Sequence, residues 1–333
     1  MKQSVKRIVS LALSLALLFC LLPTQSLAAG GVLKNINVQL SHPVAGEYYV
    51  SVAYPADTSR YKVTSFDYYP LSSTGAEQPS LSTSKPFVLG TVYRIYVQVK
   101  SINGWTIDSD TRVTINGRTA ELFKKSSSTA ATYTVEIKAG NTIFEDVPSG
   151  KWYSEAVDYC FDNSLMFGTG DGTSFSPNAP FTRGMFVTVL ARIDKTNLDD
   201  YSGTSFTDVK ASKWYAPAVE WAFQNQYTSG VGNQKFAPEK GLTRETLAMF
   251  LYNYTAKKYG AQSLASGASL SSYADKAKVS AWAQDAVAWA VKEGLISGVA
   301  QNGKSYLMPK RIASRAVVAQ IVMKYMSNVI SKS

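Results

Sequence analysis

The sequence has few of the residue types that most often carry metal or nucleophilic chemistry. Among its 333 residues there are two cysteines, Cys20 and Cys160, and a single histidine, His42. A lone histidine has no partners for a site that binds a metal through several histidines, or for a Ser/His/Asp arrangement. We therefore predict no metal and no cofactor, and we expect no catalysis that depends on histidine.

The N-terminus combines a basic start with an apolar stretch that is short for a membrane span. Three basic residues within positions 2–7 precede a run that extends to Leu22, and Ser26 and Ala28 place small residues where signal peptidase requires them. Residues 1–28 are therefore interpreted as a signal peptide that is removed on export, with no stable membrane insertion afterwards. A retained N-terminal membrane anchor is the alternative.

Cysteine usage fits an exported chain without disulfide bonds. Removal of the signal peptide leaves Cys160 alone, so no intramolecular disulfide can form. Cys160 lies four residues after Ala156 in an apolar helical pattern, and we expect a buried, unreactive thiol. Lipidation at Cys20 is not expected, because the bulky Phe19 stands where a small residue is required.

Charge points to an acidic partner outside the cell. The formal net charge is +10, and removal of the three basic residues of the signal peptide leaves +7. A basic chain can bind nucleic acid, but export makes anionic wall polymers the more fitting partner. We therefore predict no binding to nucleic acid.

The segment from residue 29 to residue 141 has the period of β-structure. Apolar and polar residues alternate in five stretches, and turn residues such as Asn116-Gly117 separate them. The predicted strands are Ile36–Leu40, Tyr48–Tyr54, Tyr93–Val99, Thr111–Ile115 and Tyr133–Ile137. This pattern predicts an all-β, sandwich-like domain.

A set of fixed spacings recurs three times after residue 141. In each copy a tryptophan stands 16 residues before a glycine, and a proline stands six residues before an arginine. These residues are Trp152, Gly168, Pro177 and Arg183; Trp214, Gly230, Pro238 and Arg244; and Trp282, Gly298, Pro309 and Arg315. An aspartate opens each copy, at Asp146, Asp208 and Asp275. Such agreement indicates an internal repeat, with units at 142–204, 205–270 and 271–333.

Each unit is predicted to fold as a helix, a loop and a second helix. An apolar stripe that begins at the tryptophan marks the first helix, and the glycine falls in the loop after it. The second helix begins after Thr182, Thr243 or Ser314, each a favourable N-cap. A two-helix unit cannot bury both apolar stripes alone, so the three units are expected to pack on one another as an all-α module.

These motifs resemble the S-layer homology domain. The resemblance rests on the opening aromatic-x-Asp, the tryptophan, the Gly-x-Gly loop and the Thr-Arg at the start of the second helix, and it covers residues 143–330. It implies a pseudo-threefold helical module that binds secondary cell-wall polysaccharide, often pyruvylated, in grooves between repeats. Residues 86–118 look like a β-sandwich module common on bacterial surface proteins.

The repeated residues are the candidate carbohydrate contacts, and each type has a structural alternative. Each arginine stands in the first turn of a helix, where the macrodipole disfavours a cation, so three copies suggest an anion site for a carboxylate. The alternative is a clamp to the repeated aspartates. Those aspartates can accept sugar hydroxyls or cap backbone N–H groups, and the glycines can set a backbone conformation or allow close approach of a ligand.

The tryptophans and the third repeat require separate expectations. A tryptophan can offer a flat face to a sugar, but each begins an apolar stripe, so core packing is the preferred interpretation. The double glycine of Gly168-Thr169-Gly170 becomes Gly298-Val299-Ala300 in the third repeat. Binding is therefore least expected at the third repeat.

Three functions compete, and non-covalent anchoring of a secreted protein to the wall of a Gram-positive type bacterium leads. The second is an enzyme, for instance a glycan hydrolase with paired carboxylates. It is disfavoured because residues 29–141 hold only eight acidic residues and none in a catalytic setting. The third is a small lattice subunit of an S-layer.

Overall fold

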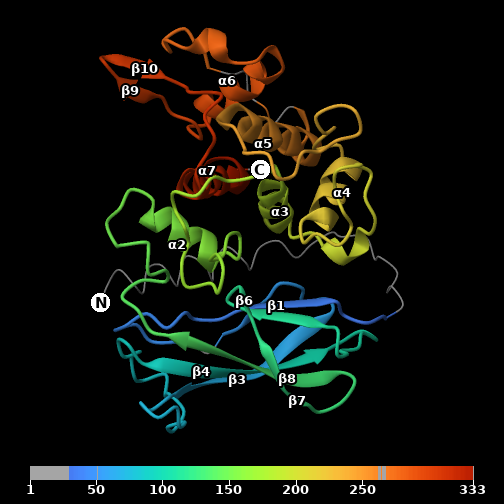
Figure 1. The fold of residues 1–333 in the computed structure, drawn as a ribbon, viewed down its shortest axis with the longest axis vertical. Coiled ribbons are helices and arrows are strands. Elements are labelled where there is room, and N and C mark those ends of the chain that lie inside the picture. The colour runs from blue at the N-terminus through green and yellow to red at the C-terminus, as the bar shows by residue number, and fades with distance from the viewer. Residues whose placement is uncertain (1–29, 51, 262–263, 265–267, 333) are drawn as a thin grey trace.

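The chain forms a β domain and a helical module with separate hydrophobic cores (Figure 1). The computed structural model describes residues 30–50, 52–261, 264 and 268–332. The predicted signal peptide and Cys20 lie outside these residues. Within the described ranges, no helix has the length and apolar character to cross a membrane.

The β domain is a sandwich of two four-stranded sheets. One sheet has the strand order β2-β1-β5-β6 and the other β3-β4-β8-β7. The strands are β1 (Asn35–Gln39), β2 (Tyr54–Pro55), β3 (Tyr61–Pro70), β4 (Val92–Ser101), β5 (Arg112–Ile115), β6 (Arg118–Thr119), β7 (Glu121–Lys125) and β8 (Ala130–Lys138). All neighbouring strands are antiparallel except β1 and β5, which are parallel.

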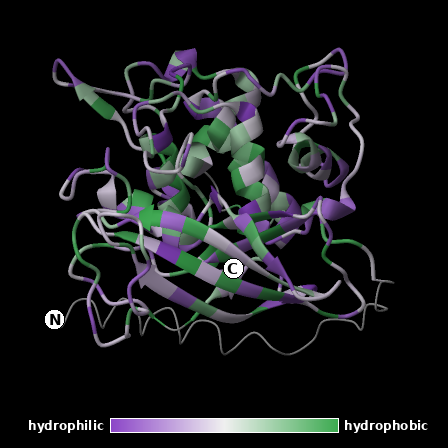
Figure 2. Ribbon diagram, turned by 60° about the horizontal axis from the view of Figure 1, so that its bottom comes forward, coloured by the Kyte–Doolittle hydropathy of each residue, from purple (hydrophilic) through white to green (hydrophobic). Residues whose placement is uncertain are grey.

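Alternation along the strands separates the core from the surface. In β4, Tyr93, Ile95 and Val97 are fully buried, whereas the residues between them are partly exposed. Figure 2 shows the same alternation as hydrophobic and hydrophilic bands along the strands of the sheet that faces the viewer. The period-2 pattern therefore predicted this strand correctly.

The predicted strand over Tyr48–Tyr54 is wrong for most of its length. Of the described residues in this range only Tyr54 belongs to a strand, the short β2, and Tyr48 and Tyr54 are more than half exposed. Alternation alone was insufficient, because a strand also needs a partner for its backbone groups. The sequence prediction missed β3, β6 and β7, whose residues are more polar or more exposed.

The helical module contains two helices from each repeat. Repeat 1 supplies α2 (Ser154–Asp162) and α3 (Arg183–Asp194), repeat 2 supplies α4 (Ala216–Gln224) and α5 (Arg244–Tyr259), and repeat 3 supplies α6 (Gln284–Lys292) and α7 (Arg315–Asn328). Short 3-10 helices are η1 (Leu198–Asp200), η3 (Lys276–Lys278), η4 (Ala281–Ala283) and η5 (Ile330–Lys332). The predicted N-caps are confirmed, since Thr182, Thr243 and Ser314 each accept a hydrogen bond from the backbone N–H three residues on.

The three repeats close into a ring. The second helix of each repeat packs on the first helix of the next, as α3 on α4 and α5 on α6, and α7 returns to α2. A cycle of backbone hydrogen bonds joins the segments before the second helices. Phe181 N–H donates to Ala313, Ala313 N–H to Leu242, and Leu242 N–H to Phe181, at 2.8–2.9 Å.

The module is not purely helical, which corrects the all-α expectation. In repeat 3, β9 (Val299–Gln301) and β10 (Lys304–Tyr306) form an antiparallel hairpin in place of a simple loop. Residues Asn302 and Gly303 at its turn both have positive φ, as a tight two-residue turn requires. This hairpin projects from the edge of the molecule away from the β domain (Figure 1).

Candidate functional site

The three repeated aspartates hold the loop of their own repeat. Asp146 accepts hydrogen bonds from the N–H groups of Phe175 and Ser176, both at 2.7 Å. Asp208 and Asp275 make the same pair of bonds at 2.8 Å, the first to Phe236 and Ala237 and the second to Leu307 and Met308. The backbone-capping alternative therefore describes the geometry, and both oxygens of each carboxylate are engaged.

The three repeated arginines reach across to the next repeat. Each donates from Nε to a backbone carbonyl there: Arg183 to Phe236 at 2.9 Å, Arg244 to Leu307 at 2.8 Å, and Arg315 to Phe175 at 2.6 Å. Arg315 and Arg183 are 7% exposed and lie over aromatic rings. Among the described residues no ion pair joins these arginines to the repeated aspartates, so the predicted arginine–aspartate clamp is corrected to a clamp on carbonyl groups.

Aspartate and arginine meet at one shared residue. At Phe236, the N–H donates to Asp208 of the same repeat while the carbonyl accepts from Arg183 of the previous one. The same pair of hydrogen bonds forms at Phe175 and at Leu307. Each boundary between repeats is therefore fixed by a chain of charge-assisted hydrogen bonds that runs through a single residue.

Burial lowers the pKa of the clamping arginines. The pKa of Arg183 and of Arg315 falls to about 10, because burial disfavours the charged form, and the nearest repeated aspartate opposes this. The pKa of Arg244 is lowered for the same reason, with the neighbouring Arg311 adding to it. All three guanidinium groups remain charged at neutral pH, as an anion site requires.

The repeated tryptophans lie on the surface. Trp152, Trp214 and Trp282 are 62%, 58% and 55% exposed, and each precedes its helix by two residues. The preferred interpretation of core packing is therefore wrong. The residues that follow, such as Ala156 and Val157, form the buried stripe instead. Three large apolar rings are therefore exposed at the same position of the three repeats.

The repeated glycines allow close packing inside the loops. A Cβ on Gly168 would stand 2.6 Å from the carbonyl oxygen of Gly172, and one on Gly230 would stand 2.4 Å from that of Lys235. At Gly298 it would collide with Ser305. Of the three, only Gly230 has the positive φ of the predicted special backbone conformation, whereas at Gly168 and Gly298 close packing within the loop excludes a side chain.

A comparison with known domain families identifies the repeats. The S-layer homology domain matches residues 143–184, 205–248 and 272–303. This chain carries three S-layer homology repeats. Such repeats are non-catalytic modules that attach proteins to the cell surface, and they indicate a location at the cell surface or in the S-layer.

Similar proteins share these repeats but are much longer. A "Surface-layer 125 kDa protein" of Lysinibacillus sphaericus is 31% identical over 53% of this chain and 14% of its own length. An "Amylopullulanase" of Thermoanaerobacterium thermosulfurigenes is 30% identical over 54% of this chain and 9% of its own. The enzymes among the relatives match only through their S-layer homology regions. The chain thus spans less than a fifth of the length of these relatives.

Solved structures also align with part of the chain. The undecaheme cytochrome from the S-layer of Carboxydothermus ferrireducens is 24% identical over 45% of this chain and 18% of that chain, with a TM-score of 0.27.

The sequence prediction missed the residues that the site clamps. Phe175, Phe236 and Leu307 stand at the same position of the three S-layer homology repeats, each two residues before the repeated proline. That fixed offset and their apolar character were the available signal. Their role lies in the backbone, however, and a backbone acceptor leaves no pattern of side-chain types in a sequence.

The two remaining chemical candidates are a buried thiol and a partly buried imidazole. Cys160 is fully buried, as predicted, and burial raises the pKa of its thiol to about 12. His42 lies against Phe161 of repeat 1, with ring centroids 5.4 Å apart. Among the described residues no group of three His, Cys, Asp or Glu side chains could hold a metal ion.

Proposed function

We propose that the three repeats bind secondary cell-wall polysaccharide and so hold the secreted chain on the wall without a covalent bond. The β domain is then displayed outward from the wall. A pyruvyl ketal or another acidic sugar group is the ligand group that suits the arginines, because a planar guanidinium pairs well with a carboxylate. Peptidoglycan-linked polymers of this kind match the basic balance of the exported chain.

The exposed tryptophans carry this proposal. An indole ring more than half exposed at Trp152, Trp214 and Trp282 contributes little to the core of its repeat. Its flat apolar face suits the carbohydrate C–H groups of one sugar ring, and its N–H suits a hydroxyl. Repetition at three positions fits a polymer that offers the same sugar many times.

An enzymatic role fits the carboxylates poorly. A glycan hydrolase needs a carboxylate pair that faces the substrate, with one acid and one base or nucleophile. Asp146, Asp208 and Asp275 each use both oxygens to hold backbone N–H groups. We therefore propose binding without turnover for these repeats.

Co-sedimentation of the mature chain with purified cell-wall sacculi tests this function. Sacculi are used before and after mild acid removes the secondary polymer and its ketals. The mature chain is expected to sediment with intact sacculi and to stay in solution with stripped ones. Sedimentation with both kinds of sacculi would move the target to peptidoglycan, and no sedimentation with either would overturn wall anchoring.

A tryptophan variant ties binding to the surface described above. We expect the triple change Trp152→Ala, Trp214→Ala and Trp282→Ala to abolish sedimentation and to leave the melting temperature nearly unchanged, because these rings are exposed. Phe123→Ala is the matched control, since Phe123 is an aromatic residue of the β domain that is 60% exposed. Loss of binding in the control, or retention in the triple variant, contradicts the assignment.

A further inference from the structure

One stretch of the β domain has the side-chain pattern of a strand but almost no backbone partner. Between residues 47 and 53 the described backbone contains no helix, strand or turn. Exposure alternates along it, since Tyr48 and Val50 are exposed whereas Tyr49 is only partly exposed, and the alternation continues up to Tyr54. We call the six described residues of this stretch the open edge: Tyr48, Tyr49, Val50, Val52, Ala53 and Tyr54.

The open edge is held on one side only. Tyr54 pairs with Gln39 of β1, and the N–H of Val50 donates to Ser41 Oγ at 2.9 Å. Because β2 is the outermost strand of its sheet, no described strand pairs with the other side. Within the described ranges, four residues of the edge make no backbone hydrogen bond: Tyr48, Tyr49, Val52 and Ala53. Free backbone groups at the edge of a sheet can accept an added strand.

The inner face of the open edge is already packed. The ring centroid of Tyr49 lies 4.9 Å from that of Tyr68 and 6.3 Å from that of Phe87. The Tyr49 hydroxyl donates to the carbonyl of Leu81 at 3.0 Å. Ala53 also packs against the core of the β domain. The edge is therefore preorganised, so an added strand does not first have to order it.

The side chains of the open edge complement those of a second copy. When two identical strands pair antiparallel around a twofold axis, Val50 can lie opposite Val52 of the second copy. The same register places Tyr48 opposite Tyr54 and Tyr49 opposite Ala53. The four outward side chains, which are 38–56% exposed, then meet in apolar pairs. Aromatic and β-branched pairs of this kind stabilise neighbouring strands.

No repulsion between charges opposes this pairing. The open edge contains no acidic or basic residue. Glu47, which precedes it, falls opposite Pro55 of the second copy, and Asp57 is paired with Arg60 of its own copy at 3.3 Å. Edge strands that stay single are commonly protected by lysine. β7, an edge of the other sheet, ends in two lysines and has this protection, which the open edge lacks.

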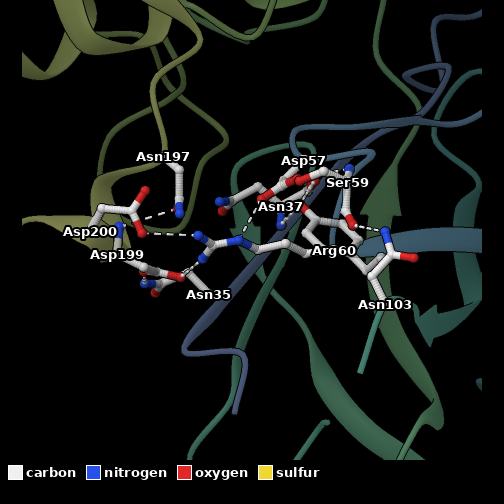
Figure 3. A network of polar contacts seen from close by, with 10 residues as sticks. Asn35, Asn37, Asp57, Ser59, Arg60, Asn103, Asn197, Asp199 and Asp200 are labelled. Atoms are coloured by element: carbon white, nitrogen blue, oxygen red, sulfur yellow. Dashed lines mark hydrogen bonds and ion pairs between the residues drawn. The ribbon is translucent and has the colours of Figure 1, made fainter. Parts of the chain in front are cut away.

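The β domain is fixed on the helical module, so its pairing also positions the repeats. Arg60 forms ion pairs with Asp199 at 3.5 Å and Asp200 at 3.0 Å, both in η1 of repeat 1 (Figure 3). Arg118 donates to the carbonyl of Gly172, also in repeat 1, at 3.4 Å. Two β domains joined at their open edges therefore hold two modules in a set arrangement.

We propose that two copies of this chain pair through their open edges, antiparallel and around a twofold axis, to form a dimer. The sheet that contains β2 then continues from one copy into the other. Such a contact uses the same surface on both copies, so it closes at two and does not extend into an array. One short strand per copy buries less than the roughly 800 Å² per partner of a standard interface, so dimers require a high local concentration. Attachment to a common surface supplies that concentration, and this consequence alone rests on the proposed function.

Sedimentation velocity of the mature chain in solution tests the pairing. The dimer fraction is expected to rise over about a hundredfold range of concentration. Val52→Lys should raise the concentration for half dimerisation by about tenfold or more, because it places a charge in the apolar contact with Val50. Val32→Lys is the matched control, since Val32 is 45% exposed and Val52 44%, but Val32 precedes β1 and lies outside the open edge. A monomer at every concentration, or an equal effect of the two lysines, overturns the proposal.

Cysteine variants test the register. A mixture of Val50→Cys and Val52→Cys chains should form disulfide-linked pairs under oxidised glutathione, because the two positions are opposite each other only in the antiparallel arrangement. Each variant alone places a cysteine opposite a valine and should link much less. The native thiol of Cys160 is fully buried and does not compete. Equal linkage in the mixture and in either variant alone overturns the register. Neither experiment contains cell wall, so failure here leaves the proposed wall binding untouched.

Discussion

At the residue scale, the position of the arginines has a physical explanation. A cation in the first turn of a helix is disfavoured by the macrodipole, and the sequence repeats this cost at Arg183, Arg244 and Arg315. In the structure, each guanidinium extends away from its own helix to carbonyl groups of the next repeat. Carbonyl oxygens carry partial negative charge, so these contacts offset the unfavourable dipole. The sequence left open whether these arginines bind a ligand or clamp the repeats together. The contacts in the structure are those of a clamp.

His42 gives a prediction about pH at the contact between the β domain and repeat 1. Burial, with a contribution from the charge of Arg118, lowers the pKa of His42 from 6.5 to about 3. The unfolded chain therefore binds a proton between these values that the folded chain excludes, so stability is complete above pH 6.5 and decreases as the pH falls toward 3. Urea unfolding of His42→Gln between pH 4 and pH 8 should show a weaker pH dependence than the parent chain.

Carboxylates titrate in the same window, so the comparison between the two proteins is the informative quantity. The two proteins have the same carboxylates, so the difference between their curves of stability against pH gives the contribution of His42. Parallel curves for His42→Gln and the parent chain would mean that His42 is free to take up a proton in the folded state.

At the element scale, the sequence predicted the helices better than the strands. Spacings that agree in three repeats fixed where the second helices begin, and the N-caps at Thr182, Thr243 and Ser314 followed from residue type. Strands had no such support. The apolar alternation of Tyr48–Tyr54 was correct as a pattern, yet of its described residues only Tyr54 is in a strand. β3 was missed, and its alternation is interrupted by a register shift between Val63 and Ser65. Which segments pair is a long-range property that local alternation does not contain.

The N-cap of α5 offers a test at this scale. Thr243 Oγ1 accepts from the N–H of Thr246 at 3.3 Å. Thr243→Ala removes this acceptor and should lower the free energy of unfolding by about 0.5–2 kcal/mol. Thr243→Ser keeps the hydroxyl and should recover most of the loss. Chemical denaturation monitored by far-UV circular dichroism measures both, and equal destabilisation by the two changes would assign the effect to the lost methyl group.

At the scale of the whole molecule, the docking of the β domain was beyond prediction from the sequence. Arg60 and Arg118 lie in no repeated motif, and nothing in their neighbours marks them as contacts to residues more than fifty positions away. Which face of the module the β domain covers was equally beyond prediction, because repeat spacings treat the three faces alike.

Removal of Arg60 should weaken the contact between the β domain and the helical module. Arg60→Ala deletes the ion pairs to Asp199 and Asp200, which contribute about 1 kcal/mol at a partly exposed site. Their loss should therefore raise the population of undocked molecules roughly fivefold. Hydrogen exchange of the loop at 168–174 should accelerate accordingly. Arg94→Ala is the control, because Arg94 pairs with Glu77 and Glu136 inside the β domain. Equal exchange in the two variants would show that Arg60 does not hold the interface.

The cycle of hydrogen bonds through Phe181, Leu242 and Ala313 sets the number of repeats. In an open solenoid each added unit extends a stack, terminal units need special caps, and stability grows in increments. A cycle has no terminal unit, and every unit borders both of the others. Deletion of one S-layer homology repeat would therefore expose two apolar faces at once, and insertion of a fourth would break the circuit. The count of three is a condition of closure, so these repeats are expected to be gained or lost in evolution as a complete set.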